Sequence, residues 1–317
     1  MRYIMFQYEE YVYTVYREKS FTRAADKLFI SQPALSTTVK KQEERLGFKI
    51  FDRTSPTLSL TEKGEVYIRA IEKLHALKKD LENQIMDISD LHAGSLTVAG
   101  ANFISSFVLS EIIERFAARY PGMDVRLIES NSKELESFVM EDKVDVVFDY
   151  TYNEDFIHGE PLLKENILLA VPKKNPLALS LSEIALTGDD IRNGIHLSPK
   201  TPPIDLAACN GSGFLILKPG NSMHRIATAL LEEGGVSYKT SFQLDQLMTA
   251  YNMCGLGMGL TFLSDTLIKT AAENPNISYY KIESSHATRT LYMEYKKHKY
   301  VNRAMRQFMA LARELYS

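Results

Sequence analysis

Residues 20–53 read SFTRAADKLFISQPALSTTVKKQEERLGFKIFDR, and this stretch predicts two helices joined by a tight turn. Thr22 is placed to cap the first helix, whose inner face carries alanines small enough to let a second helix approach closely. Ser31 is placed to cap the second helix, and Pro33 lies in its first turn, where a missing N–H costs little. The pattern therefore predicts a helix-turn-helix, a motif whose second helix enters a DNA major groove.

The second helix has an inner face and an open face. Leu35, Val39 and Leu46 follow the helical period and form the inner face. Polar side chains on the open face would meet base edges, and nearby basic side chains would meet phosphate oxygens. An exposed Gln or Thr on a helix can equally be solvated, so the polar candidates could either contact bases or only face solvent. The DNA-binding candidates are Thr22, Arg23, Ser31, Gln32, Pro33, Ser36, Thr37, Lys40, Lys49 and Arg53.

The motif resembles the winged helix-turn-helix of LysR-type transcriptional regulators. Their typical pattern is SFTxAAxxLxxSQPALSxxIxxLExxLGxxLFxR followed by LTxxG, and Leu60, Thr61 and Gly64 supply its last part here. Residues 53–60 would then form a small wing. Gln42 departs from the pattern because it stands where the family has leucine, and it is expected to remove some core contact.

Positive charge is concentrated near this motif. The chain has 317 residues and a formal net charge of −3. Residues 1–60 hold ten Lys and Arg against seven Asp and Glu, whereas residues 94–317 hold 22 against 26. Because each copy would neutralise few phosphates, useful DNA affinity requires two or more copies acting together.

The remaining composition narrows the class of protein. Cys209 and Cys254 are the only cysteines, which favours free thiols in a reducing compartment over the alternative of a redox switch. The seven histidines lack metal-binding spacing, so no metal site and no cofactor is expected. Since the sequence has neither a membrane-spanning apolar stretch nor a secretion leader, we expect a cytoplasmic protein outside the membrane.

Residues 61–91 predict one long helix. Thr61 is its expected cap, Gly94 lies just past its end, and apolar residues recur in steps of three and four, as in a coiled coil. The alternative is an amphipathic helix that packs on its own chain, but pairing of two subunits through this helix is favoured. In the resembling family this helix forms dimers, which commonly assemble into tetramers. The dimerisation candidates are Leu74, Leu77, Leu81, Gln84 and Ile88.

After Gly94 the sequence alternates strands and helices. Predicted strands at 95–99, 124–129 and 144–148 are separated by helical segments, which is the βαβαβ order of a mostly parallel sheet. Further strands are expected at 167–171, 214–217, 241–244, 259–263, 278–282 and 291–295. A second α/β half is therefore expected.

This region also resembles the LysR effector domain through LTVAG, RFAARYPGMDVRL, KVDVVF, LLAVPKKNPLA and GLGMGLTFL. The resemblance implies a bilobed, type 2 periplasmic-binding-protein-like architecture whose chain crosses between lobes near Lys164 and Ser264. The expected fold is thus an α+β winged helix-turn-helix at 1–60, a linker helix at 61–92 and an α/β effector domain at 93–317. Its lobe I comprises residues 93–164 and 265–317, and its lobe II comprises residues 165–264.

The effector is expected in the crevice between the lobes, beyond the carboxyl ends of the strands. Polar residues that follow the strands could hold a carboxylate through backbone N–H groups, although Ser and Asn at helix starts also act as caps. The family often has Ser or Thr where Phe103 stands, which points to a more apolar or aromatic effector. The effector-binding candidates are Asn102, Phe103, Ile104, Ser105, Asn131, Ser132, Thr151, Ser198 and Pro199.

Two glycine-rich stretches do not support an enzyme. Gly255, Gly257 and Gly259 precede a predicted strand instead of joining a strand to a helix, as a dinucleotide-binding loop would, so a tight turn is expected. The Gly-Ser-Gly at 211–213 lacks the spacing of a nucleophile elbow. No catalytic residue is therefore assigned.

The sequence as a whole predicts a DNA-binding regulator that senses a small metabolite and alters promoter binding. The expected partners are double-stranded promoter DNA, a small effector such as a carboxylate, a homodimer or homotetramer, and RNA polymerase. The alternative is an effector-independent repressor or a regulator controlled by a partner protein.

Overall fold

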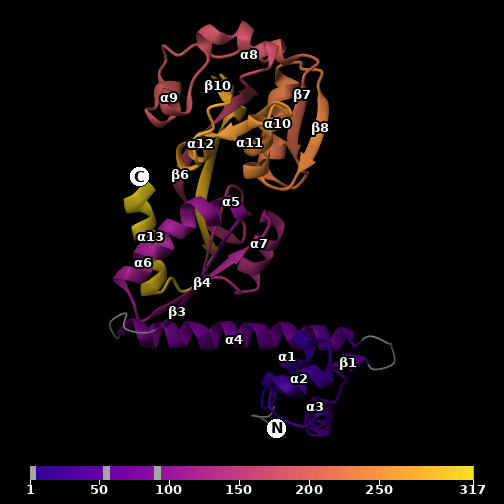
Figure 1. The fold of residues 1–317 in the computed structure, drawn as a ribbon. Helices are drawn as coiled ribbons and strands as arrows, with labels where there is room; N and C mark the ends of the chain where they lie inside the picture. Colours follow the sequence, from indigo (N-terminus) through magenta and orange to yellow (C-terminus); the bar gives the residue numbers. More distant parts are fainter. Residues whose placement is uncertain (1–4, 53–57, 89–93, 317) are drawn as a thin grey trace. The chain divides into compact units, whose positions relative to one another are not determined.

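The computed structural model describes residues 5–52, 58–88 and 94–316. The chain divides into two compact units, Met1–Ile85 and Met86–Ser317, which are described separately (Figure 1). Arg53, and the side chain of Ile88, lie outside the described residues.

The N-terminal unit is the predicted winged helix-turn-helix. Its elements are α1 (Glu9–Glu18), α2 (Phe21–Lys27), α3 (Gln32–Leu46), the antiparallel strands β1 (Phe51–Asp52) and β2 (Ser59–Leu60), and α4 (Glu62–Ile88). Helix α1 was not predicted from the sequence; it buries Val12 and Val15 against Ala24 and Ala25 of α2 and Leu35 of α3.

The predicted cap of α2 was wrong by two residues. Ser20 has the extended backbone of an N-cap, and its hydroxyl accepts a hydrogen bond from the Arg23 N–H at 3.3 Å. Thr22 instead lies exposed within the first turn, because Phe21 begins the helix and does not precede it. The predicted cap of α3 is confirmed, since the Ser31 hydroxyl accepts from the Ala34 N–H at 3.4 Å.

A close backbone contact fixes the start of α4 against the wing. The Thr61 hydroxyl accepts from the Gly64 N–H at 2.9 Å and donates to the Lys49 carbonyl at 2.6 Å. A Cβ added to Gly64 would lie 2.0 Å from the Ile50 carbonyl oxygen, closer than any side chain allows. This contact explains why the LTxxG pattern ends in glycine.

Gln42 is buried, and besides removing the expected core contact it forms hydrogen bonds. Its amide donates to the Met5 carbonyl at 2.6 Å and to the Tyr67 hydroxyl at 2.9 Å, and the Tyr67 hydroxyl also donates to Met5. Burial raises the pKa of Tyr67 to about 12, so its hydroxyl remains a donor. A buried polar cluster thus replaces the leucine contact of the family pattern.

The first turns of α4 pack into the core of the N-terminal unit. Tyr67, Ile68 and Ile71 are buried with the residues of α1 and α2, so the apolar periodicity at this end is explained within one chain. Farther along, Leu77 and Leu81 are 67% and 56% exposed. The exposed apolar seam therefore begins after the first turns of α4.

Lobe I of the C-terminal unit is a sheet covered on both faces. It contains β3 (Gly94–Gly100), α5 (Asn102–Ile104), a π-helical turn (Ser105–Leu109), α6 (Ser110–Arg119), β4 (Met123–Glu129), α7 (Ser132–Met140), β5 (Val146–Asp149), the first part of β6 (Ile157–Pro172), β11 (Thr288–Lys296) and α13 (Arg303–Tyr316). The strand order is β6-β11-β5-β3-β4. α6 and α13 pack on one face, where Phe116 meets Phe308, and α7 packs on the other.

Lobe II is a second α/β layer. Its elements are α8 (Pro176–Ser180), α9 (Gly188–Arg192), β7 (Gly213–Leu217), α10 (Ser222–Glu233), β8 (Lys239–Leu244), α11 (Leu247–Gly255), β9 (Thr261–Ser264), α12 (Asp265–Thr270) and β10 (Ile277–Lys281), with short 3-10 turns at Ser182–Ile184, Ile195–Leu197, Leu206–Cys209 and Ser285–Ala287. The glycines at 255–259 form the expected tight turn, in which Gly257 has a φ of +88° and Gly259 lies against the Gly213 carbonyl.

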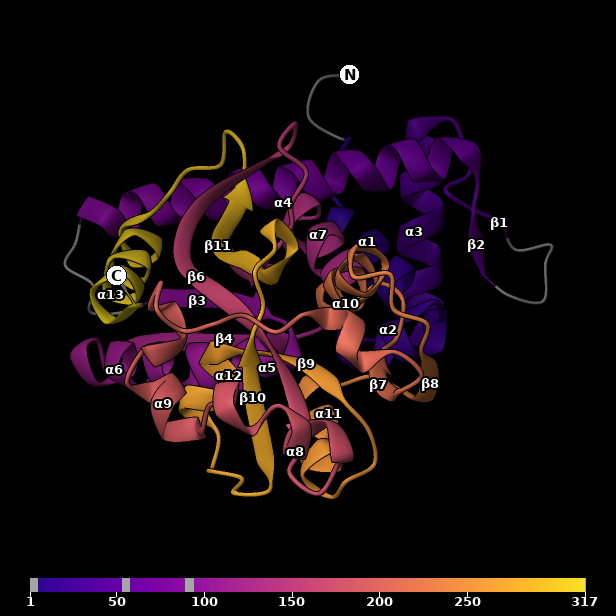
Figure 2. The same cartoon turned by 90° about the horizontal axis from the view of Figure 1, so that it is seen from above.

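The crossings between the lobes differ from the prediction in one place. Strand β6 pairs with β11 of lobe I up to Asn166 and with β9 and β10 of lobe II from Ile167 onward (Figure 2). This crossing lies close to the expected Lys164. The return crossing does not lie near Ser264, because α12 and β10 bury their apolar residues in the lobe II core and the chain re-enters lobe I only with β11. The apolar pattern of β10 does not reveal which core it joins.

Candidate nucleic-acid interface and effector cleft

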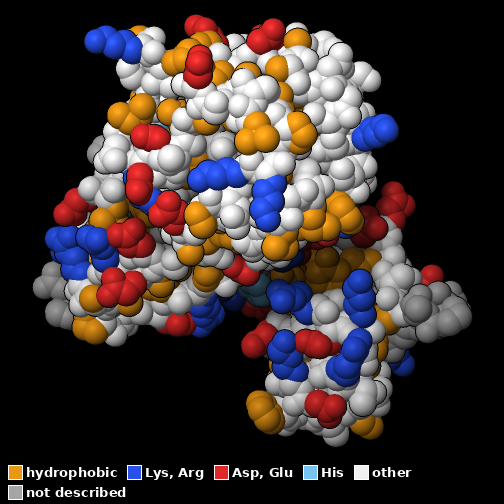
Figure 3. All heavy atoms as spheres, turned by 45° about the horizontal axis from the view of Figure 1, so that its top comes forward, with side chains coloured by type: hydrophobic (Ala, Val, Ile, Leu, Met, Phe, Trp, Pro, Cys, Tyr) orange, Lys and Arg blue, Asp and Glu red, His pale blue; other side chains and the backbone are white. Residues whose placement is uncertain are grey.

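Helix α3 presents the predicted open face. Gln32, Thr37 and Lys40 are exposed, whereas Leu35 and Val39 are buried. The Thr37 hydroxyl donates to the Pro33 carbonyl at 2.8 Å, which leaves its oxygen as an acceptor on the helix surface. In the space-filling view, Lys and Arg side chains gather on the N-terminal unit, interspersed with Asp and Glu (Figure 3).

Two further basic candidates, Arg23 and Lys49, contact carbonyl or acidic oxygens of the chain itself. Arg23 donates to the Glu18 carbonyl at 2.6 Å, and the Lys49 ammonium lies 3.6 Å from the Glu43 carboxylate. Glu43 is buried, and its other oxygen accepts from the Ile50 and Phe51 N–H groups at 2.8 and 3.2 Å. Glu43 therefore anchors the entry to the wing and was not predicted as a structural residue.

At the edge of lobe I, the predicted candidates divide into two groups. Ile104 is fully buried in the lobe I core, and Ser105 uses its hydroxyl and its N–H on the Gly100 and Ala101 carbonyls. The helical turn thus engages the polar groups of Ser105, and the Ile104 side chain lies in the core; effector contact by these two residues stays a prediction. Asn102 is exposed, and Phe103 is half-buried between the cores of both lobes.

The second pair of candidates follows β4. Asn131 caps α7, because its side chain accepts from the Glu134 N–H at 3.1 Å. Ser132 hydrogen-bonds to Asp149 at the end of β5. Burial raises the pKa of Asp149, and the hydrogen bonds from Ser132 and the Tyr150 N–H only partly oppose this effect. Thr151, two residues farther along, is exposed.

Arg289 lies at the junction of the two lobes, and it was not among the residues predicted from the sequence. It lies opposite Glu165 in the pairing of β11 with β6, and its Nε donates to the Glu165 carboxylate at 2.6 Å. Its Nη1 donates to the Ser222 hydroxyl of lobe II at 2.9 Å, and its guanidinium lies 3.6 Å from the centre of the Tyr150 ring. Arg225 of α10 lies near enough to lower the pKa of Asp149. These groups line the junction of the two lobes.

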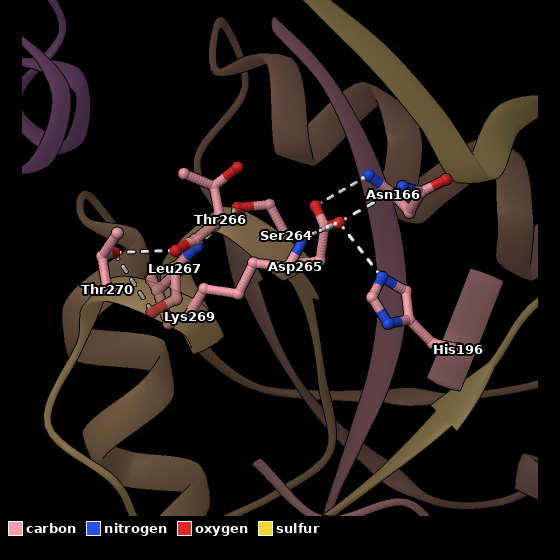
Figure 4. Close-up of polar contacts among 8 residues, drawn as sticks. All are labelled: Asn166, His196, Ser264, Asp265, Thr266, Leu267, Lys269 and Thr270. Carbon is pink, nitrogen blue, oxygen red and sulfur yellow. Dashed lines mark hydrogen bonds and ion pairs between the residues drawn. The ribbon is translucent and has the colours of Figure 1, made fainter. Parts of the chain in front are cut away.

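Figure 4 shows a second polar cluster, at the first crossing between the lobes. The Asp265 carboxylate accepts from the Asn166 N–H at 2.9 Å, from Lys269 at 2.9 Å and, at 3.1 Å, contacts the buried His196 ring. Burial alone would raise the pKa of Asp265, but the hydrogen bonds from His196, Lys269 and Asn166 outweigh burial and hold it well below its usual range. Asp265, the first residue of α12, therefore links this helix to Asn166 at the crossing between the lobes.

The last predicted candidates lie next to this cluster. The Ser198 hydroxyl accepts from the Lys200 N–H at 3.2 Å, and the Ser198 carbonyl accepts from Lys281 at 2.8 Å. Pro199 is exposed. These contacts associate Ser198 with β10 of lobe II.

Other chemical groups offer little reactivity. Burial raises the pKa of Cys209 and Cys254 to about 12, so neither thiol ionises readily at neutral pH.

Within the described ranges, no three His, Cys, Asp or Glu side chains are grouped closely enough to hold a metal ion. A search of the same residues finds no helix long and apolar enough to cross a membrane.

A winged helix-turn-helix followed by a bilobed α/β domain defines a DNA-binding regulator with a sensor domain. A family model described as "Bacterial regulatory helix-turn-helix protein, lysR family" matches residues 8–65, and the "LysR substrate binding domain" matches residues 89–188 and 191–317. The chain belongs to the LysR family of transcriptional regulators, which are not enzymes.

Relatives and solved structures agree with this assignment. The chain is 29% identical to the "Uncharacterized HTH-type transcriptional regulator YcgK" of Bacillus subtilis (strain 168), over 96% of this chain and 93% of that protein. Its fold is similar to that of a full-length OxyR variant from Pseudomonas aeruginosa, with a TM-score of 0.68 and 21% identity over 96% of this chain and 91% of that one. It is also similar to CbnR in complex with its target DNA, with a TM-score of 0.52 and 17% identity over 96% and 97% of the two chains.

The Asp265 cluster predicts a specific pH dependence. Replacing Asp265 with Asn should lower the free energy of unfolding of the C-terminal unit by about 2–4 kcal/mol at pH 7, because it breaks a buried charge network. The folded-state pKa of Asp265 is lowered, so its contribution is complete above the unfolded value of about 4 and is lost as pH falls below it. Urea denaturation between pH 3 and pH 7, followed by circular dichroism, should show the difference between wild type and D265N shrinking with acid.

The matched control is Asp245→Asn, because the Asp245 ion pair with Lys218 is exposed. This variant should differ from wild type by less than about 0.5 kcal/mol at every pH. A D265N difference that stays constant with pH would contradict the assigned role of the carboxylate.

Proposed function

We propose that the C-terminal unit binds a small effector at the junction of its lobes and thereby changes how the regulator engages promoter DNA. The observation that carries the proposal is the bond from Arg289 of lobe I to Ser222 of lobe II, beside the buried Asp149. A molecule that bound between these groups would interact differently with open and closed lobes, as a conformational signal requires. The predicted contacts that remain part of the proposal are Asn102, Phe103, Ile104, Ser105, Asn131, Ser132, Thr151, Ser198 and Pro199, to which Asp149, Ser222, Arg225 and Arg289 are added.

The DNA-contact assignment rests on the exposed face of α3. Gln32 near its N-terminus is proposed to read a base edge, and Lys40 is proposed to contact a phosphate. The proposed positioning contacts are Thr22, Arg23, Ser31, Pro33, Ser36, Thr37, Lys49 and Arg53. Two copies paired through Leu74, Leu77, Leu81, Gln84 and Ile88 of α4 would present two such faces to related half-sites, as a dimer or within a tetramer. RNA polymerase is the further partner, and the cytoplasm is the proposed location.

A second candidate is an effector-independent regulator. Arg289 is largely buried by Glu165, Tyr150 and Ser222, so the chain's own side chains occupy part of the junction. The effector test below separates the two candidates.

The two DNA roles predict different mutational effects. Gln32→Ala should change the preferred base at one position of the selected site, with a loss of about 1–3 kcal/mol for the best site. Lys40→Ala should weaken binding to all sequences and reduce the slope of affinity with salt by about one. Fluorescence anisotropy on DNA selected from a random pool measures both, with Lys174→Ala of lobe II as the control. Uniform weakening by Gln32→Ala would exclude base reading.

The α4 seam predicts the assembly state. Leu77→Lys combined with Leu81→Lys should give monomers that bind operator DNA at least tenfold more weakly, because the two half-sites no longer act together. Glu65→Lys, which also adds positive charge to an exposed α4 position, should leave the assembly unchanged. Analytical ultracentrifugation and DNA titration provide the measurements. A dimeric double variant would show that the seam lies elsewhere.

Effector sensing predicts a ligand response that depends on the lobe junction. A thermal-shift screen of small organic acids, amino acids and aromatic acids should find compounds that raise the midpoint of unfolding. Ser222→Trp should abolish this rise by filling the junction while retaining DNA binding. A compound that binds should also alter the operator footprint. Absence of any response to such a panel would favour the effector-independent candidate.

A further inference from the structure

The lobe junction buries carboxylate oxygens whose capacity to accept hydrogen bonds is only partly used. Glu165 is 1% exposed, and its Oε1 has no hydrogen-bond partner, since the other oxygen binds Arg289. Burial, together with the nearby carboxylate of Glu165, raises the pKa of Tyr150 well above its usual value, so its hydroxyl stays protonated and faces Glu165 as a donor. An occupant that donates hydrogen bonds to such buried carboxylates would lower the free-energy cost of burying them.

Negative charge is also in excess at this place. The carboxylates of Asp149 and Glu165 are both buried, whereas Arg289 is the one buried cation beside them among the described residues of the junction. Arg289 is already engaged by Glu165, by Ser222 and by the Tyr150 ring. The carboxyl of Asp149 therefore lacks a dedicated counter-charge of its own.

Glu294 lies beside Asp149 on the same face of the sheet. In the pairing of β11 with β5, Tyr292 lies opposite Asp149 and Glu294 lies opposite Val147, so the two carboxyls are diagonal neighbours on one face. Diagonal positions in an antiparallel pair are about 7–8 Å apart. Burial and the charge of Asp149 raise the pKa of Glu294 to about 9, so Glu294 is mostly neutral and the negative charge resides on Asp149.

Lobe II supplies the complementary charge. Arg225 lies on α10, three residues after Ser222, is exposed, and is close enough to act on Asp149. The guanidinium of Arg225 could bind a carboxylate in a forked geometry while Asp149 receives a cation from the opposite side.

We propose that the effector is an amino acid whose ammonium pairs with Asp149 and whose carboxylate pairs with Arg225. An ammonium carries three donors, which suits the buried carboxylate of Asp149. This assignment rests on the proposed function, because it names the chemical class of molecule that the lobe junction senses. Binding both lobes through one small molecule would favour their closure.

The test uses the full-length protein and matched pairs of probes. Each of the twenty L-amino acids is compared with its des-amino acid, such as glutamate with glutarate and phenylalanine with 3-phenylpropionate, by thermal shift and then calorimetry. At least one amino acid should raise the midpoint of unfolding, and its des-amino partner should bind at least tenfold more weakly. Asp149→Asn should weaken amino-acid binding at least tenfold, because a buried charge pair is lost.

The control Asp245→Asn, at an exposed position of lobe II, should bind as wild type does. Equal binding of des-amino and amino acids, unchanged affinity of D149N, or no response to any amino acid would each overturn the amino-acid assignment. Stabilisation by des-amino acids that Ser222→Trp abolishes would overturn it while preserving the sensing function. No stabilisation by either set of probes would count against both.

Discussion

The C-terminal unit depends on one strand that belongs to two sheets. Strand β6 runs through both lobes, and its register changes partners between Asn166 and Ile167. At this point the backbone N–H of Asn166 turns to the Asp265 carboxylate instead of to a sheet neighbour. A buried N–H without a partner is costly, so Asp265 allows the strand to leave one sheet and enter the other without that cost. The proposed effector site lies next to this change of partner, because Glu165 directly precedes it on β6 and pairs with Arg289 of β11.

The N-terminal unit depends on a comparable constraint between backbones. Gly64 lets the start of α4 lie against the Ile50 carbonyl, while Glu43 binds the N–H groups of Ile50 and Phe51. Together these contacts hold α3, the wing entry and α4 as one body, so the recognition helix and the seam of α4 have a fixed relation within this unit. If two copies pair through α4 as proposed, that rigidity would set the spacing of their α3 helices. The modest local positive charge is the reason for proposing that two copies act together on DNA.

Local sequence patterns predicted much of this fold and part of its site. Ser31, Pro33 and the apolar spacing of α3 located the recognition helix, and the strand positions in both lobes were largely correct, because caps and periodicity depend on neighbouring residues. Arg289, Glu165 and Asp149 were missed, since their proximity arises from cross-strand register between segments more than a hundred residues apart. Tyr67 is the converse case. Its apolar spacing on α4 was recognised from the sequence, but the spacing alone did not show that Tyr67 is buried in the core of its own unit.

The buried charges of the lobe junction lower stability, and the proposed effector site gives a reason for keeping them. An apolar junction of the same volume would be more stable, since desolvation of Arg289 and Glu165 consumes much of their mutual attraction. A junction sealed by apolar packing would also give a small polar molecule nothing to displace. The bond between Arg289 and Ser222 is a single neutral-partner hydrogen bond across the lobes, worth on the order of 1–3 kcal/mol. An interaction of that size can be exchanged for ligand contacts of similar strength, so modest differences in ligand affinity are enough to shift the lobes between arrangements.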